Sequence, residues 1–290
     1  MAPIAPIFNV FYYLGSGALL IEDVTGPGEK LWATPINMLE ILAGVSPNEW
    51  DSRRDAAKAI VTYGDGMAAD PEVHLAAVIE RRPPALDKIW LDGAKALAQA
   101  TSEVELLRGV SDFDDRVVRK AQPSIAAAAK AQHYEAFKSD IIKVCEHLVP
   151  GYKASVEAGT QAPVVEKPNR DKLRAFLASS EFIEEVFLTG LCKRYRLFGT
   201  SKIDLQSEDT FLARQDLDPY CRIYGAYLRE LLTTRRKPDL NDWGDLELFI
   251  YLQPGTYVAT AEKKWWTIAD SVGLGDRVKK LVPKHPRPSR

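Results

Sequence analysis

The chain has 290 residues, of which 46% are hydrophobic and 27% charged, and its formal net charge is −2. This composition is typical of a globular protein with a sizeable core, in one large domain or two small ones. The slightly negative net charge differs from the strongly positive charge of many nucleic-acid-binding proteins. Three widely spaced cysteines and four histidines predict a reducing compartment, with no disulfide framework and no structural zinc site.

The apolar N-terminal stretch 4–21, "IAPIFNVFYYLGSGALLI", needs to be distinguished from a targeting segment. No basic residues precede it, polar and glycine residues interrupt it, and it is short for a membrane span. We therefore expect no signal peptide and no membrane partner. A cytoplasmic location is the corresponding prediction.

The first predicted elements are two strands and a helix. Residues 6–14, "PIFNVFYYL", are rich in aromatic and β-branched residues and predict a strand. Residues 22–29 predict a loop, and residues 30–34, "KLWAT", a second strand. A helix is expected to begin at Pro35 with Thr34 as its N-cap, and to end near residue 46.

The middle of the chain, residues 48–237, has apolar residues at near-3.6 spacing among strong helix formers, which predicts helices. Residues 238–280 then predict a helix, a turn at Pro254-Gly255 and a strand at 256–260, "TYVAT". We expect residues 1–47 and 238–280 to form one α/β core, a mostly parallel sheet flanked by helices. Residues 48–237 would be a mostly helical insertion, and 281–290 a flexible basic tail.

Acidic side chains stand at the boundaries of these terminal elements. Glu40 lies in the first predicted helix, Asp242 and Asp245 open a late helix, and Glu262 follows the strand "TYVAT". In parallel α/β proteins, ligands collect beyond the carboxyl ends of the strands. Carboxylates gathered there repel one another unless a cation binds, and hard oxygen ligands suit Mg²⁺ or Mn²⁺.

Three phrases, "ATPINMLEIL", "NDWGDLELFIYL" and "YVATAEKKW", resemble in order and spacing those of PIN-like nucleases such as bacterial toxin RNases. The resemblance covers about residues 4–45 and 238–280. It implies a PIN-like Rossmannoid fold, with Glu40 and Asp245, or the close second Asp242, as metal ligands. Asp245 and Thr260 are 15 residues apart, which matches the family spacing, and Glu262 takes the final acidic position.

The chain departs from the family pattern at two positions. The first acidic position, in the first strand, would be Asn9, which carries no charge, and the last acid is glutamate rather than the usual aspartate. Asn9 and Thr260 are therefore expected to support the site rather than to supply charge. The resemblance implies Mg²⁺ or Mn²⁺ as cofactor, RNA as substrate, and a protein inhibitor or a second copy of the chain as a further partner.

Each of these residues also has a structural explanation. Asp242 and Asp245 suit the start of a helix, where Asn241 or Asp242 would be the N-cap. Glu40 suits a solvated helix position, and Glu262 an exposed charge run. The amide of Asn9 would bond to backbone in a buried strand.

Basic residues that could contact RNA phosphates occur in three runs, "LCKRYRLFG", "TTRRKP" and "EKKWW". The candidates are Lys193, Arg194, Arg196, Arg235, Arg236, Lys263 and Lys264. Aromatic side chains beside them could stack on unpaired bases. The structural alternative is a solvated face for each run and a core position for Trp265 and Trp266.

Two functions follow as hypotheses. The first is a metal-dependent endoribonuclease that resembles the toxin RNases, in which Glu40, Asp242, Asp245 and Glu262 hold the cation. The second is a catalytically inactive PIN-like protein that binds RNA or protein. The uncharged Asn9 favours the second hypothesis.

Overall fold

The computed structural model describes residues 3–6, 9–43, 49–83, 86–102, 105, 123–193 and 208–285. Its five strands are β1 (Pro3–Pro6), β2 (Lys30–Ala33), β3 (Gly66–Met67), β4 (Tyr257–Thr260) and β5 (Val278–Lys280). They form one sheet in the order β3-β2-β1-β4-β5, and all neighbours are parallel. Ile4 of β1 pairs with Leu31 on one side and Tyr257 on the other, so the two ends of the chain meet in this sheet.

Helices account for most of the described residues. The first group comprises α1 (Asn9–Gly15), α2 (Ile21–Val24), α3 (Pro35–Leu42), α4 (Trp50–Tyr63), α5 (Pro71–Ile79) and α6 (Lys88–Gln99). The middle group comprises α9 (Pro123–Leu148), α10 (Tyr152–Glu157), the 3₁₀ helix η2 (Lys167–Asn169), α11 (Arg170–Leu177), α12 (Ser180–Glu185) and the π-helix η3 (Val186–Lys193). The last group comprises α14 (Glu208–Thr234), α15 (Leu240–Glu247), η4 (Leu248–Tyr251), α16 (Lys263–Asp270) and η5 (Gly275–Arg277).

These proportions overturn the expected fold class. The strands have only two to four residues each, whereas single helices reach 26 and 27 residues. The prediction of a PIN-like Rossmannoid α/β protein, dominated by a mostly parallel sheet with flanking helices, is therefore wrong. The described part of the chain is predominantly helical, and the small sheet serves to join its two ends.

The largest local error lies in the first predicted strand. β1 ends at Pro6, and residues from Asn9 onward form α1 instead of continuing a strand. Val10, Phe11 and Leu14 are buried and lie on one side of this helix, because Leu14 follows Phe11 by three residues and Val10 by four. A short run that is apolar at nearly every position does not distinguish a strand from a buried helix. Gly15 allows α1 to approach α4 closely, because a side chain there would place its Cβ 2.5 Å from the carbonyl oxygen of Asp55 in α4.

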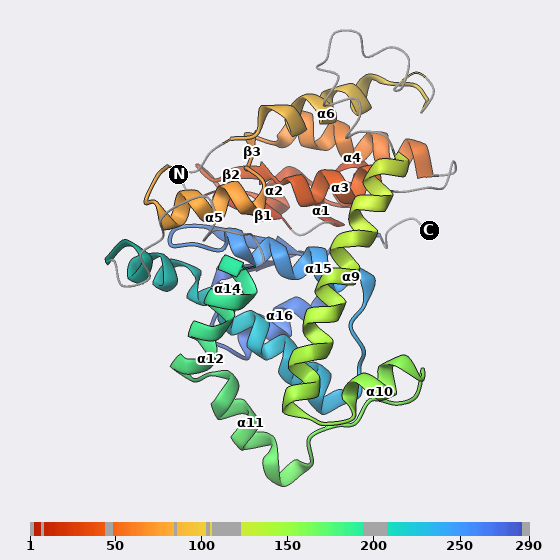
Figure 1. Cartoon of the computed structure of the whole chain (residues 1–290). Coiled ribbons are helices and arrows are strands. Elements are labelled where there is room, and N and C mark those ends of the chain that lie inside the picture. Colours follow the sequence, from red (N-terminus) through yellow and green to blue (C-terminus); the bar gives the residue numbers. More distant parts are fainter. Residues whose placement is uncertain are drawn as a thin grey trace.

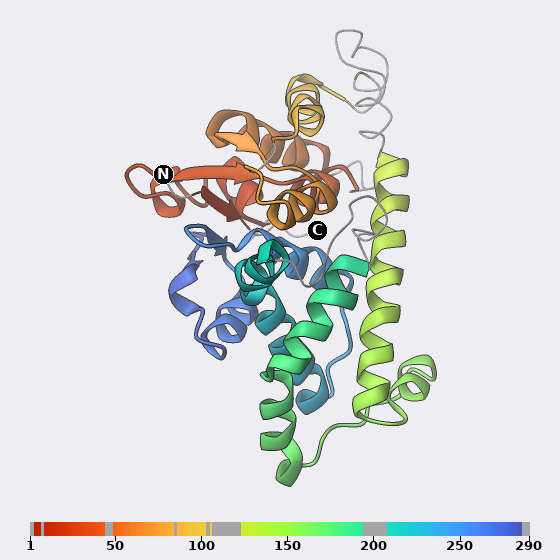
Figure 2. The same cartoon turned by 60° about the vertical axis from the view of Figure 1, so that its left-hand side comes forward.

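One strand of the sheet comes from the middle of the chain, where mostly helices were expected. β3 lies within the predicted helical insertion, yet it pairs with β2 at the edge of the sheet. α4 packs closely on α1 and α6, and both α4 and α6 lie above the N-terminal strands in Figure 1. α14 and α16 lie on the other side of these strands, and α9 runs along the side of the molecule (Figures 1 and 2).

One hydrophobic cluster extends through these layers, and its largest buried side chains include Trp265, Tyr227, Phe249 and Phe11. Trp265 thus occupies the core position that was the structural alternative to a role in base stacking. Within the described ranges, no helix has both the length and the apolar character needed to cross a membrane.

Candidate functional site

Glu40 lies in the second turn of α3, the helix that follows β2. Thr34 caps this helix as expected, because its hydroxyl accepts a 3.2 Å hydrogen bond from the backbone N–H of Asn37. Glu40 is only 6% exposed, so it is not a solvated surface position. Its carboxylate forms an ion pair with Lys130 of α9. A carboxylate buried to this extent needs such a partner, because burial without one is costly.

Asp245 lies close to Glu40, although 205 positions separate them in sequence. A Cβ on Gly244 would lie 3.3 Å from Oε1 of Glu40, so this glycine allows α15 to approach α3. Asp245 is buried, and its Oδ2 accepts a 2.8 Å hydrogen bond from Nε1 of Trp265. Burial, followed by the negative charge of Glu262, raises the pKa of Asp245 well above its ordinary value, and Glu40 acts in the same direction.

Asp242 has a different environment from that of Asp245. It accepts a 2.8 Å hydrogen bond from the Tyr227 hydroxyl and bonds of 3.0 and 3.2 Å from the Arg236 guanidinium. Lys264 forms a further ion pair with it, and the backbone N–H of Asp239 lies 3.3 Å from its Oδ2. Both carboxylate oxygens of Asp242 thus accept hydrogen bonds or pair with cations within the chain. We therefore interpret Asp242 as a structural anion rather than an open metal ligand.

The position of Asp242 within α15 explains part of this arrangement. The N-cap of α15 is Asp239, whose side chain accepts from the N–H of Asn241 at 3.0 Å. The expected caps, Asn241 and Asp242, therefore lie inside the helix. Asp242 is the third helical residue and completes a capping box with Asp239.

Glu262 and Thr260 follow at the carboxyl end of β4. The Thr260 hydroxyl accepts a 2.9 Å hydrogen bond from the backbone N–H of Glu262, which orders the turn between β4 and α16. Glu262 is the N-cap residue of α16 and is partly buried. Lys264 lies over the ring of Trp265, 4.3 Å from its centroid, while its ammonium group pairs with Asp242.

The structure thus brings Glu40, Asp245 and Glu262 near one another from α3, α15 and the turn after β4. The ammonium groups of Lys130 and Lys264 lie beside them. The carboxylate oxygens are of the type that Mg²⁺ and Mn²⁺ prefer. As they stand, however, they do not form a coordination shell: among the described residues, no group of three or more His, Cys, Asp and Glu side chains is arranged to hold a metal ion. Positive charge reaches Glu40 from Lys130 instead.

Most of the predicted RNA contacts whose side chains the structure describes are engaged within the chain. Arg236 and Lys264 are both paired with Asp242, and Arg236 also pairs with Glu230. Arg235 donates a 2.7 Å hydrogen bond to Gln161, and Lys263 is exposed. Arg194, Arg196 and the side chains of Lys193 and Asn9 lie outside the described residues.

Sequence patterns missed the partners that decide the electrostatics of this cluster. Lys130 lies in an alanine-rich helix that shows no local sign of a link to Glu40. Tyr227 is one of several apolar or aromatic residues on α14, and nothing in its neighbourhood indicates a bond to Asp242. Such pairs arise from helix packing between distant segments, which local periodicity does not encode.

Comparisons of the chain with protein-family models, with curated protein sequences and with solved structures found no match. The function therefore has to be argued from the arrangement of the side chains themselves.

Proposed function

We propose that this chain is a metal-dependent ribonuclease whose cation is held by Glu40, Asp245 and Glu262. The observation that carries the proposal is the proximity of three carboxylates from α3, α15 and the β4–α16 turn. Oε1 of Glu40 lies against Gly244, the neighbour of Asp245. The charges of Glu262 and Glu40 add to burial in raising the pKa of Asp245. Bound Mg²⁺ or Mn²⁺ would activate water and neutralise charge on a phosphodiester. Asp242 is not part of this proposed ligand set.

The proposal assigns separate tasks to the surrounding side chains. Trp265 holds one oxygen of Asp245 in place, and the Thr260 hydroxyl orders the backbone that carries Glu262. Lys130 offsets the charge of Glu40 when no other cation is present. Cation binding at Glu40 therefore requires Lys130 to move away, and its released ammonium group is then available to a phosphate.

A non-hydrolytic RNA-binding protein is the second candidate. The ion pair between Lys130 and Glu40 favours it, because this lysine already supplies the charge that a metal would bring. The uncharged residue at the first acidic position, Asn9, points the same way. In this case the carboxylates stabilise the junction of α3, α9 and α15 and have no catalytic task.

One experiment separates the two candidates. Purified protein is incubated with single-stranded RNA in Mn²⁺, in Mg²⁺ and in EDTA, beside the Asp245→Asn variant. The ribonuclease proposal requires cleavage that depends on the metal and is lost in the variant. Absence of cleavage by the wild-type protein in both metals, together with RNA binding in EDTA, would establish the second candidate.

A further inference from the structure

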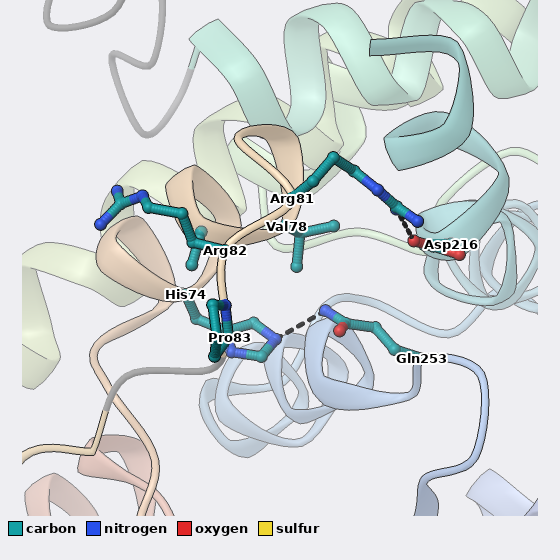
Figure 3. A pocket seen from close by; sticks show the side chains of 8 residues that line it. His74, Val78, Arg81, Arg82, Pro83, Asp216 and Gln253 are labelled. Carbon is teal, nitrogen blue, oxygen red and sulfur yellow. Dashed lines mark hydrogen bonds and ion pairs between the residues drawn. The ribbon is translucent and has the colours of Figure 1, made fainter. Parts of the chain in front are cut away.

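A second site lies away from the carboxylate cluster, in a pocket of about 280 Å³ between α5 and α14. The turn after α5 and residue Gln253, which precedes β4, complete its lining (Figure 3). Thr260, by contrast, ends β4, so this strand separates the pocket from the carboxylates. The volume is just below the range of about 300–1,000 Å³ for drug-sized ligands, which indicates a smaller occupant.

The charges around the pocket are paired. Arg81 extends across to Asp216 of α14 and forms an ion pair with it (Figure 3). Arg82 pairs with Glu80, and Figure 3 shows its side chain directed away from Arg81. The pocket therefore suits an uncharged group with hydrogen-bonding edges better than it suits a free ion.

The protonation state of His74 follows from its contacts with Gln253. The amide nitrogen of Gln253 lies 2.6 Å from Nε2 of His74 and 3.4 Å from the carbonyl oxygen of Ile250, which can only accept. With the amide nitrogen of Gln253 as donor, Nε2 of His74 is the acceptor. The proton of the neutral ring then lies on Nδ1, a buried nitrogen with no hydrogen-bond partner among the described residues. The same orientation leaves Oε1 of Gln253 as an acceptor on the pocket side, since it receives no hydrogen bond from any described residue.

Apolar surface lines the space between these polar groups. Ala77, Val78 and Pro83 contribute it, and Figure 3 shows Val78 and Pro83 in the wall near His74. Arg81 has a φ of 54°, a left-handed conformation that is uncommon for a residue other than glycine. The ion pair with Asp216 helps to hold this turn in place and directs the guanidinium to the rim.

We propose that this pocket binds a guanine base. The apolar side chains of Ala77, Val78 and Pro83 offer contact to a flat, neutral ring, and the rim offers a carboxylate acceptor beside a guanidinium donor. Guanine presents complementary groups side by side: O6 and N7 accept from arginine, while N1–H and the N2 amino group donate. Arg81 pairs with Oδ2 of Asp216, so Oδ1 of Asp216 would receive the N–H groups of the base and a remaining N–H of Arg81 would donate to O6. Oε1 of Gln253 would be a further acceptor.

The inference stands whether or not the carboxylate cluster hydrolyses RNA, because it uses none of the same residues. Guanine could reach the pocket in a free nucleotide or as an unpaired base of single-stranded RNA. Guanosine monophosphate and a short uridine oligonucleotide with one central guanosine distinguish these sources. Tighter binding of the oligonucleotide identifies RNA, and equal or weaker binding identifies the nucleotide.

The test is a titration followed through the imidazole nitrogen resonances. The chain has four histidines, so His133, His147 and His285 serve as internal controls for His74. We expect guanosine monophosphate to shift the His74 signals alone. Inosine monophosphate has the same phosphate but lacks the N2 amino group, and it should bind about tenfold more weakly, as expected for loss of a hydrogen bond to a charged group.

Two variants of α14 complete the test. Asp216→Asn should weaken binding of guanosine monophosphate about tenfold, whereas Asp218→Asn should leave it unchanged, since Asp218 pairs with Arg222 and does not line the pocket. The proposal is overturned if guanosine monophosphate leaves the His74 signals unmoved at millimolar concentration. It is equally overturned if inosine or adenosine monophosphate binds as tightly, or if both variants behave alike.

Discussion

Nε1 of Trp265 donates a 2.8 Å hydrogen bond to Oδ2 of Asp245, and both side chains are buried. This bond joins the first turn of α16 to α15 and directs the carboxylate into the cluster with Glu40 and Glu262. Asparagine has nearly the same shape as aspartate, and its side-chain oxygen can accept the same bond. Substitution at Asp245 therefore removes charge while it retains the contact.

For Asp245→Asn we expect a folded protein in which any Mn²⁺-dependent ribonuclease activity falls at least about tenfold, or about 1.4 kcal/mol in the barrier. The reason is the loss of one charged oxygen ligand. Initial cleavage rates measure the effect. Asp239→Asn is the control, because it removes a charge from the same helix and leaves an equally good N-cap. Equal rates for wild type and Asp245→Asn would remove Asp245 from the proposed site.

Asp242→Asn should act on stability instead. Asp242 is buried beside Arg236 and Lys264, and loss of its charge leaves both cations without their main partner. We expect the free energy of unfolding to fall by about 2–4 kcal/mol, allowing for the partial exposure of Arg236. Urea denaturation of Asp242→Asn and Asp245→Asn provides the comparison. A smaller loss for Asp242→Asn than for Asp245→Asn would contradict the structural role assigned to Asp242.

Lys130→Met tests whether the lysine competes with a cation for Glu40. The variant keeps much of the side-chain volume but leaves the buried carboxylate without its partner. We expect a lower melting temperature in EDTA, tighter Mn²⁺ binding by calorimetry, and a larger rise in melting temperature on addition of Mn²⁺ than for wild type. Lys138→Met, on the same helix and paired with Glu135, is the matched control. An unchanged affinity for Mn²⁺ in Lys130→Met would speak for the non-hydrolytic candidate.

Because His74 is buried and neutral, we expect the free energy of unfolding to fall in acid. Burial lowers the pKa of its imidazole from 6.5 to about 4. Between these values the unfolded chain binds a proton that the folded chain does not, so the free energy of unfolding falls as pH falls from about 6.5 to about 4. The maximum contribution is about 3 kcal/mol.

Denaturation of wild type and His74→Gln at pH 7, 6 and 5 measures this contribution, in a range above most carboxylate titrations. The loss on acidification should be smaller in His74→Gln. His147→Gln, at an exposed position, should behave like wild type. The same pH dependence in all three proteins would show that His74 is protonated in the folded state.

Local patterns in the sequence determined several elements correctly. Thr34 and Pro35 define the start of α3, because a hydroxyl cap and a fixed φ suit the first turn of a helix. The helical character of the middle of the chain follows in the same way from its periodicity, as does the short strand that ends at Thr260. The residues that the resemblance selected, Glu40, Asp245 and Glu262, were also available from the sequence.

Tertiary structure decided what local patterns leave open. The apolar run after Pro6 became α1, since a helix there packs on α4 and buries Val10, Phe11 and Leu14. Contacts between distant segments likewise decided that the sheet is small and that helices make up most of the described residues. Asp242 and Asp245 are three residues apart on one helix, yet one faces Arg236 and Lys264 while the other faces Trp265 and the carboxylates. Charge and hydrogen-bond partners come from segments distant in sequence, so only the folded chain distinguishes a structural anion from a candidate ligand.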